Sequence, residues 1–140
     1  MLVSSVQAWN NFVMRSNPAC YERESLMRAA AIANRFMGGA NNGGLNSFLN
    51  SSYDLDAYEV QNALVAVGAK MAARQLQSVL DGLCIPLPVS SQGERWSLLE
   101  KYWRDELNEF EALSKETNDE LMSVLENHVA ANEDFYVKLG

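Results

Sequence analysis

Residues 94–114 read ERWSLLEKYWRDELNEFEALS and carry the clearest helical period in the chain. Apolar side chains recur there at steps of three and four residues, at Trp96, Leu99, Trp103, Leu107, Phe110 and Leu113. Such spacing places side chains on one face of an α-helix. The stretch therefore predicts one long helix over residues 94–114. Because its three aromatic side chains share the apolar stripe, we expect them in the core rather than on a binding surface.

The same spacing extends over most of the chain. It predicts further helices over residues 3–15, 21–37, 45–50, 55–67 and 69–81, and a final helix that begins around residues 117–119. Residues 38–44, GGANNGG, favour a tight turn because glycine and asparagine are poor residues for a helix interior. Residues 85–88, IPLP, are expected to be extended, and residues 89–93 to form a loop.

These patterns, with no alternating strand pattern among them, predict an all-α fold. The chain of 140 residues, 48% of them hydrophobic, fits a single compact domain of about six to seven helices. Its two cysteines, Cys20 and Cys84, make no disulfide framework and are expected to be buried as small apolar residues. The N-terminal residues lack the features of a signal peptide, and no segment is apolar enough to span a membrane. We therefore expect a cytoplasmic protein.

Catalytic and metal-binding patterns are missing from the sequence. The one histidine, His128, lies on the apolar stripe of the last helix and is interpreted as a buried structural residue. The glycines of residues 38–44 lack the Gly-Lys-Ser/Thr ending of a phosphate-binding loop and follow no strand. Glu126 and His128 are two residues apart, which is not the Glu-x-x-His spacing of di-iron bundles. We expect no enzymatic activity, no cofactor and no metal.

The net charge of −7 lies entirely in the C-terminal part of the chain. Residues 1–90 hold six acidic and six basic side chains, whereas residues 91–140 hold 12 acidic against five basic ones. The single domain is therefore expected to have a neutral N-terminal part and acidic C-terminal helices. An acidic surface repels nucleic acid and anionic membranes, and it attracts basic proteins.

The acidic side chains are densest over residues 105–120. Seven occur there: Asp105, Glu106, Glu109, Glu111, Glu116, Asp119 and Glu120. On one continuous helix that rises about 1.5 Å per residue, this is one negative charge per roughly 3.4 Å, close to the phosphate spacing along one DNA strand. A merely solvated helix face would show the same pattern. We take all seven as candidate partner-binding residues and expect Asp105, Glu109, Glu116 and Glu120 to face outward.

Two motifs resemble a known family. Residues 42–51, NGGLNSFLNS, and residues 63–69, ALVAVGA, followed by Ala72 and Leu76, are similar to a bacterial helical family first catalogued as a domain of unknown function. Leu45 stands where that family leads us to expect an aromatic residue. The resemblance covers about residues 35–80. It implies an all-α fold and a non-enzymatic role, because the family includes an acidic DNA-mimic protein that acts as a dimer and blocks operator binding by a transcription factor.

The acidic C-terminal part and this resemblance together predict a DNA-mimic-type inhibitor. Such a protein would occupy the DNA-binding surface of a basic protein, would bind neither nucleic acid nor membrane itself, and could form a homodimer. The alternative is an immunity protein or antitoxin that neutralises a nuclease-type toxin through the same acidic surface. A third interpretation is a small enzyme, which the missing catalytic pattern disfavours, and a fourth is a scaffold domain whose charge serves only solubility.

Overall fold

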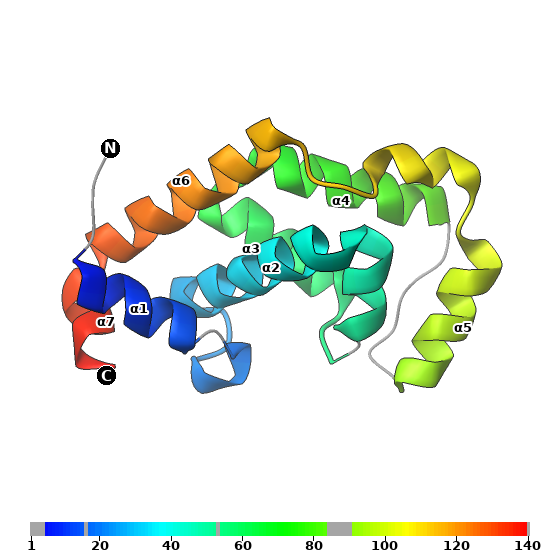
Figure 1. Ribbon diagram of the computed structural model, residues 1–140. Helices are drawn as coiled ribbons and strands as arrows, with labels where there is room; N and C mark the ends of the chain where they lie inside the picture. Colours follow the sequence, from blue (N-terminus) through cyan, green and yellow to red (C-terminus); the bar gives the residue numbers. More distant parts are fainter. Residues whose placement is uncertain (1–4, 16, 53, 84–90, 140) are drawn as a thin grey trace.

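The computed structural model describes residues 5–15, 17–52, 54–83 and 91–139. Over these residues the protein consists of helices without strands, so the predicted all-α fold is confirmed (Figure 1). The helices are α1 (Val6–Met14), η1 (Pro18–Cys20, 3-10), α2 (Leu26–Ser51), α3 (Ala57–Val67), α4 (Lys70–Leu83), α5 (Gln92–Tyr102), η2 (Asp105–Phe110, 3-10), α6 (Lys115–Ala131) and α7 (Glu133–Lys138). None of the described helices is long and apolar enough to cross a membrane.

Helix α2 is the centre of the fold. It packs against α3, α5 and α6, while α1 packs against α7 at one end of the molecule and α5 lies at the other end (Figure 1). One hydrophobic cluster joins these elements, from Phe12 on α1 through Leu64 on α3 to Tyr136 on α7. A continuous core of this kind defines a single domain.

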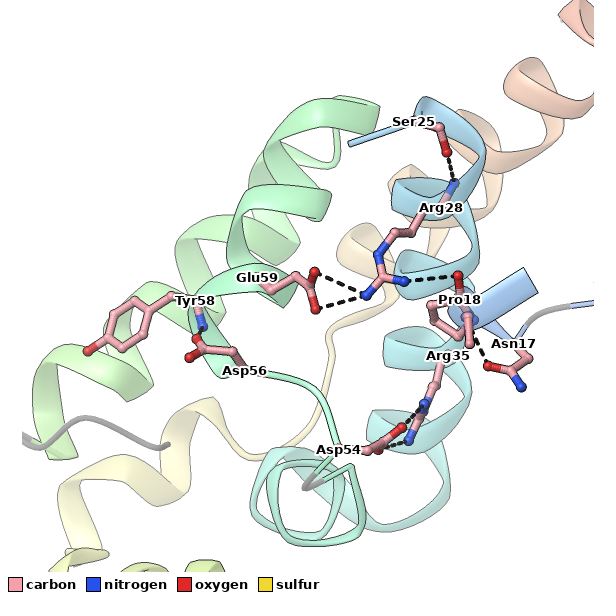
Figure 2. A network of polar contacts seen from close by, with 10 residues as sticks. Asn17, Pro18, Ser25, Arg28, Arg35, Asp54, Asp56, Tyr58 and Glu59 are labelled. Atoms are coloured by element: carbon pink, nitrogen blue, oxygen red, sulfur yellow. Dashed lines mark hydrogen bonds and ion pairs between the residues drawn. The ribbon is translucent and has the colours of Figure 1, made fainter. Parts of the chain in front are cut away.

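Two ion pairs connect α2 to the chain around the start of α3 (Figure 2). Arg28 donates through Nη2 to both carboxylate oxygens of Glu59, at 3.2 and 3.1 Å. Arg35 donates through Nη1 to the carboxylate of Asp54 at 3.0 Å, and this hydrogen bond holds the pKa of Asp54 below its usual value. These contacts fix the antiparallel arrangement of the first half of α2 and α3.

Residues 38–43 are helical, so the predicted tight turn over residues 38–44 is wrong for all but its last residue. Helix α2 runs to Ser51 as two helical segments joined at Gly44, the one residue inside it with non-helical geometry, φ 89° and ψ 174°. Packing explains the difference. A Cβ on Gly39 would lie 2.7 Å from the ring of Phe48, which is buried, so the glycine makes room for that ring. Burial of the aromatic ring outweighs the poor helix propensity of glycine.

The predicted long helix over residues 94–114 is also wrong, because the chain bends in the middle of it. Helix α5 ends at Tyr102, and Trp103, with ψ 127°, begins an extended connection to η2. Leu99 and Leu107 are both buried, as their stripe predicted. However, α5 packs on α2, whereas η2 packs on α4. One straight helix could not direct the apolar stripe of residues 94–114 toward both α2 and α4.

Helix α5 is held to α2 by a buried arginine. Arg95 is 1% exposed and donates through Nη1 to the carbonyl oxygen of Leu49 at 3.1 Å and through Nη2 to that of Leu55 at 3.0 Å. Burial lowers the pKa of Arg95, and the charges of Asp56 and Asp54 act in the opposite direction. Arg95 is one of the few basic residues in the acidic part of the chain, residues 91–140. Its guanidinium nevertheless points into the protein.

His128 is a buried structural residue, as the sequence predicts. Its Nε2 lies 2.6 Å from the hydroxyl oxygen of Tyr136, and the side chain of Asn132 donates to its carbonyl oxygen at 2.8 Å. Phe12 of α1 meets both rings edge-on. Burial lowers the pKa of His128 from its ordinary value, so the imidazole is neutral at pH 7.

The remaining predictions about local structure have mixed outcomes. Cys20 is exposed, so its predicted burial is wrong. Residues 92–93, predicted as loop, form the start of α5. Cys84 and the predicted extended stretch 85–88 lie outside the described residues, as do residues 89–90.

We expect Gly44→Ala to lower the free energy of unfolding by about 1–3 kcal/mol, because a non-glycine residue at positive φ is strained. A Cβ there would also lie 2.5 Å from the carboxylate of Glu111. Gly38 provides the matched control, since a Cβ at this helical position meets nothing within 4 Å. Gly38→Ala should stabilise the protein by roughly 0.5–1 kcal/mol. Urea denaturation measures both, and equal effects of the two substitutions would contradict this explanation.

Stability should fall as the pH is lowered through the range of histidine titration. The pKa of His128 is lower in the folded protein than its unfolded value near 6.5, so the unfolded chain binds the proton more readily. The contribution of neutral His128 is therefore complete above about pH 6.5 and is lost progressively below it. Urea melts at several pH values between 8 and 5 would compare the wild type with His128→Gln. Parallel curves for the two proteins would contradict the prediction.

Candidate protein-binding surface

The seven candidate acidic residues lie on η2, on the first turns of α6 and on the connection between them. We call residues 105–120 the acidic segment. Because the chain is not one helix here, the phosphate-like spacing of about 3.4 Å, which assumed a continuous α-helix, is wrong as a linear repeat. Residues 105–110 form a 3-10 helix, residues 111–114 are not helical, and α6 begins at Lys115.

The acidic segment is fixed to α4 by packing and by hydrogen bonds. Leu107 is 4% exposed and lies against Gly82, where a Cβ would overlap with its side chain. Gln75 of α4 donates through Nε2 to the carbonyl oxygens of Phe110 at 2.6 Å and Ala112 at 3.0 Å. Arg104 donates to the carbonyl oxygen of Gly82 at 2.9 Å. These contacts anchor the backbone of residues 104–112 to α4.

Two of the seven carboxylates cap helices inside the molecule. Glu111 accepts from the backbone N–H of Leu45 through its carbonyl oxygen at 2.8 Å and from that of Asn46 through its carboxylate at 3.2 Å. Both donors follow the break at Gly44, so Glu111 replaces the acceptors that the break removes. Glu120 accepts from the backbone N–H of Met71 at 2.8 Å, in the first turn of α4. A negative charge at a helix N-terminus also interacts favourably with the helix dipole.

The other five acidic side chains point to solvent. Asp105, Glu106, Glu109 and Glu116 are exposed and form no ion pair or side-chain hydrogen bond within the described residues. Asp119 is exposed and accepts from Lys115 at 3.1 Å, an i,i+4 pair on the surface of α6. Of the four residues expected to face outward, Glu120 is half-buried and caps α4, whereas Glu106, which was not among the four, is exposed.

One surface residue on α5 is not indicated by the hydrophobic spacing. Trp96 was expected in the core with Trp103 and Phe110, which are partly buried against it. Instead, Trp96 is 53% exposed on α5. Its neighbour Arg95 occupies the buried position, and a buried arginine on an apolar stripe leaves no signal in hydrophobic spacing.

The described residues offer no metal-binding arrangement. They contain no group of three or more histidine, cysteine or acidic side chains that could hold a metal ion. A cleft of about 650 Å³ lies between the start of α2 and α3. Arg28 and Glu59, which are bound to each other, are among its lining residues (Figure 2). No residue of the acidic segment lines it.

The family described as DMP19-like protein matches this chain over residues 25–136. The protein belongs to this family. The match extends from Ser25, which caps α2, to Tyr136 in α7, so it includes both the glycine-rich motif and the acidic segment, while α1 lies outside it. Among curated proteins and solved structures, no match is found. The resemblance seen over residues 35–80 therefore extends in this DMP19-like protein to nearly all of the core.

Glu120→Ala should lower the free energy of unfolding by on the order of 1 kcal/mol, because it removes an acceptor from the N-terminus of α4. Glu109→Ala is the matched control: its carboxylate is exposed and has no described partner, so the change should stay within about 0.5 kcal/mol. Urea denaturation at low ionic strength gives both values. A Glu120→Ala effect no larger than that of the control would show that the carboxylate is not a cap.

Proposed function

We propose that this DMP19-like protein is a non-enzymatic inhibitor that imitates DNA. It occupies the DNA-binding surface of a basic protein, such as a transcription factor. The observation that carries this proposal is the set of exposed carboxylates at Asp105, Glu106, Glu109 and Glu116, which have no described partner in the chain.

The support comes from how these charges are held. Four unpaired carboxylates on the short stretch from residue 105 to 116 repel each other, which is a local cost to the folded state. The contacts of Leu107, Gln75 and Glu111 nevertheless anchor the backbone around Asp105, Glu106 and Glu109, and Glu116 lies in the first turn of α6. A fixed array of negative charge loses little conformational freedom when it meets a basic surface, so more of the electrostatic attraction appears as affinity.

The proposal also agrees with the distribution of charge over the whole chain. Residues 1–90 have no net charge and residues 91–140 carry −7. The negative charge is therefore concentrated in one part of the chain. A charge that served only solubility would have no need to be collected in one part. A surface of this kind steers a basic partner toward one orientation and excludes nucleic acid.

The test reverses the four exposed charges in the variant Asp105→Lys, Glu106→Lys, Glu109→Lys and Glu116→Lys. Partners are recovered from the source cell with the wild-type protein, and each is then bound to its DNA. Wild-type protein should displace that DNA, with an affinity that weakens steeply as salt rises. The variant should bind the partner at least about 100-fold more weakly, a loss of about 2.7 kcal/mol.

A second variant controls for net charge. It reverses four exposed acidic residues outside the acidic segment: Glu22, Glu24, Glu94 and Asp134. It carries the same total charge as the first variant and should keep most of the affinity. Equal loss in both variants would indicate general charge attraction, and a partner that keeps its DNA while bound would argue against mimicry. A partner with nuclease activity that is silenced by binding would instead identify an immunity protein.

A further inference from the structure

Trp96 is an exposed aromatic side chain that the fold does not use. Among the described residues its ring has no aromatic or cation contact, and its indole N–H has no hydrogen-bond acceptor. The neighbouring Trp103 shows the contrast, since its indole Nε1 donates to Asn108 at 2.9 Å. Tryptophan carries a large apolar area and a polar N–H, and it is enriched among the residues that dominate protein interfaces.

The surroundings of Trp96 on α5 are open and include one carboxylate, that of Glu100. Helix α5 packs through Arg95 and Leu99, which are buried, and turns Trp96 outward. Gly93, one turn before Trp96, has no side chain to cover the ring, and Glu100, one turn after it, is exposed. The ring thus has a free face with a carboxylate four residues along the same helix.

The basic residues nearest in sequence do not occupy this face. Arg95 donates to two buried carbonyl groups, and Lys101 lies over the ring of Tyr102 at 5.2 Å from its centroid. An aromatic face next to a carboxylate, with no cation of its own chain among the described residues, is complementary to a planar cation. The arginine guanidinium stacks on aromatic rings and forms two parallel hydrogen bonds with a carboxylate, which the lysine ammonium cannot do.

We propose that Trp96 stacks against an arginine side chain of the basic partner, with Glu100 as the acceptor of that guanidinium. This inference rests on the proposed function, because it assumes that the acidic segment brings a basic protein to this side of the molecule. It adds a chemical preference that charge alone would not give: arginine-rich surfaces are bound in preference to lysine-rich ones.

The experiment uses two peptides of equal charge, nona-arginine and nona-lysine, titrated against the full chain by calorimetry at physiological salt. Wild-type protein should bind nona-arginine roughly five- to tenfold more tightly than nona-lysine. Part of any preference for nona-arginine comes from the carboxylates. The decisive measurement is therefore how much this preference changes when Trp96 is substituted. Trp96→Leu keeps an apolar side chain but removes the aromatic face, and it should reduce the preference to twofold or less. Trp96→Phe should keep a measurable part of it.

The matched control is Phe135→Leu, which alters an aromatic residue that is 39% exposed on α7 and already contacts Tyr21 and Tyr136. It should leave the arginine preference unchanged. An unchanged preference in Trp96→Leu, or equal affinity of wild-type protein for the two peptides, overturns the inference. The variant reversed at Asp105, Glu106, Glu109 and Glu116 separates the two proposals. It should bind both peptides more weakly than the wild type, and to the same extent. If the peptides bound this variant as tightly as the wild type, the proposed function would be overturned instead.

Discussion

The contact between Glu111 and the chain after Gly44 is the interaction on which the rest of the structure depends. At Gly44 the backbone takes a positive φ, and the N–H groups of Leu45 and Asn46 lose their acceptors within the helix. Glu111, 65 residues after Asn46, supplies two acceptors in their place. Uncompensated, two buried or half-buried backbone donors would each cost on the order of 1–3 kcal/mol. The break and its cap are therefore stable only together.

Several features follow from this contact. Since α2 breaks at Gly44, Phe48 can reach Gly39 and pack edge-on against Phe36, with ring centroids 5.1 Å apart. Since the acceptor is Glu111, the chain after α5 must return to the middle of the molecule rather than continue as a helix. The bend at Trp103, the packing of η2 on α4 and the position of the acidic segment all satisfy that requirement.

The same carboxylate chemistry thus serves two purposes in one short stretch. Glu111 and Glu120 face donors at helix N-termini and hold α2 and α4, whereas Asp105, Glu106, Glu109 and Glu116 face solvent. The inward carboxylates give the outward ones a fixed backbone. This arrangement accounts for an acidic segment that is both strongly self-repelling and well anchored, and such an anchored array suits the recognition of a basic protein.

The sequence by itself determined the fold class, the central apolar stripes and the partition of charge. Leu99, Leu107 and His128 are buried as their spacing indicated, because a side chain's position on a helical stripe depends only on local periodicity. The tertiary structure decided where the helices break and which carboxylates remain free. Gly38 to Gly43 stay helical, and residues 94–114 do not form one continuous helix, because the contacts with Phe48 and α4 outweigh local propensities of a few tenths to 1 kcal/mol per residue. Glu111 and Glu106 look alike in sequence, and only the distant donors at Leu45 and Asn46 distinguish them.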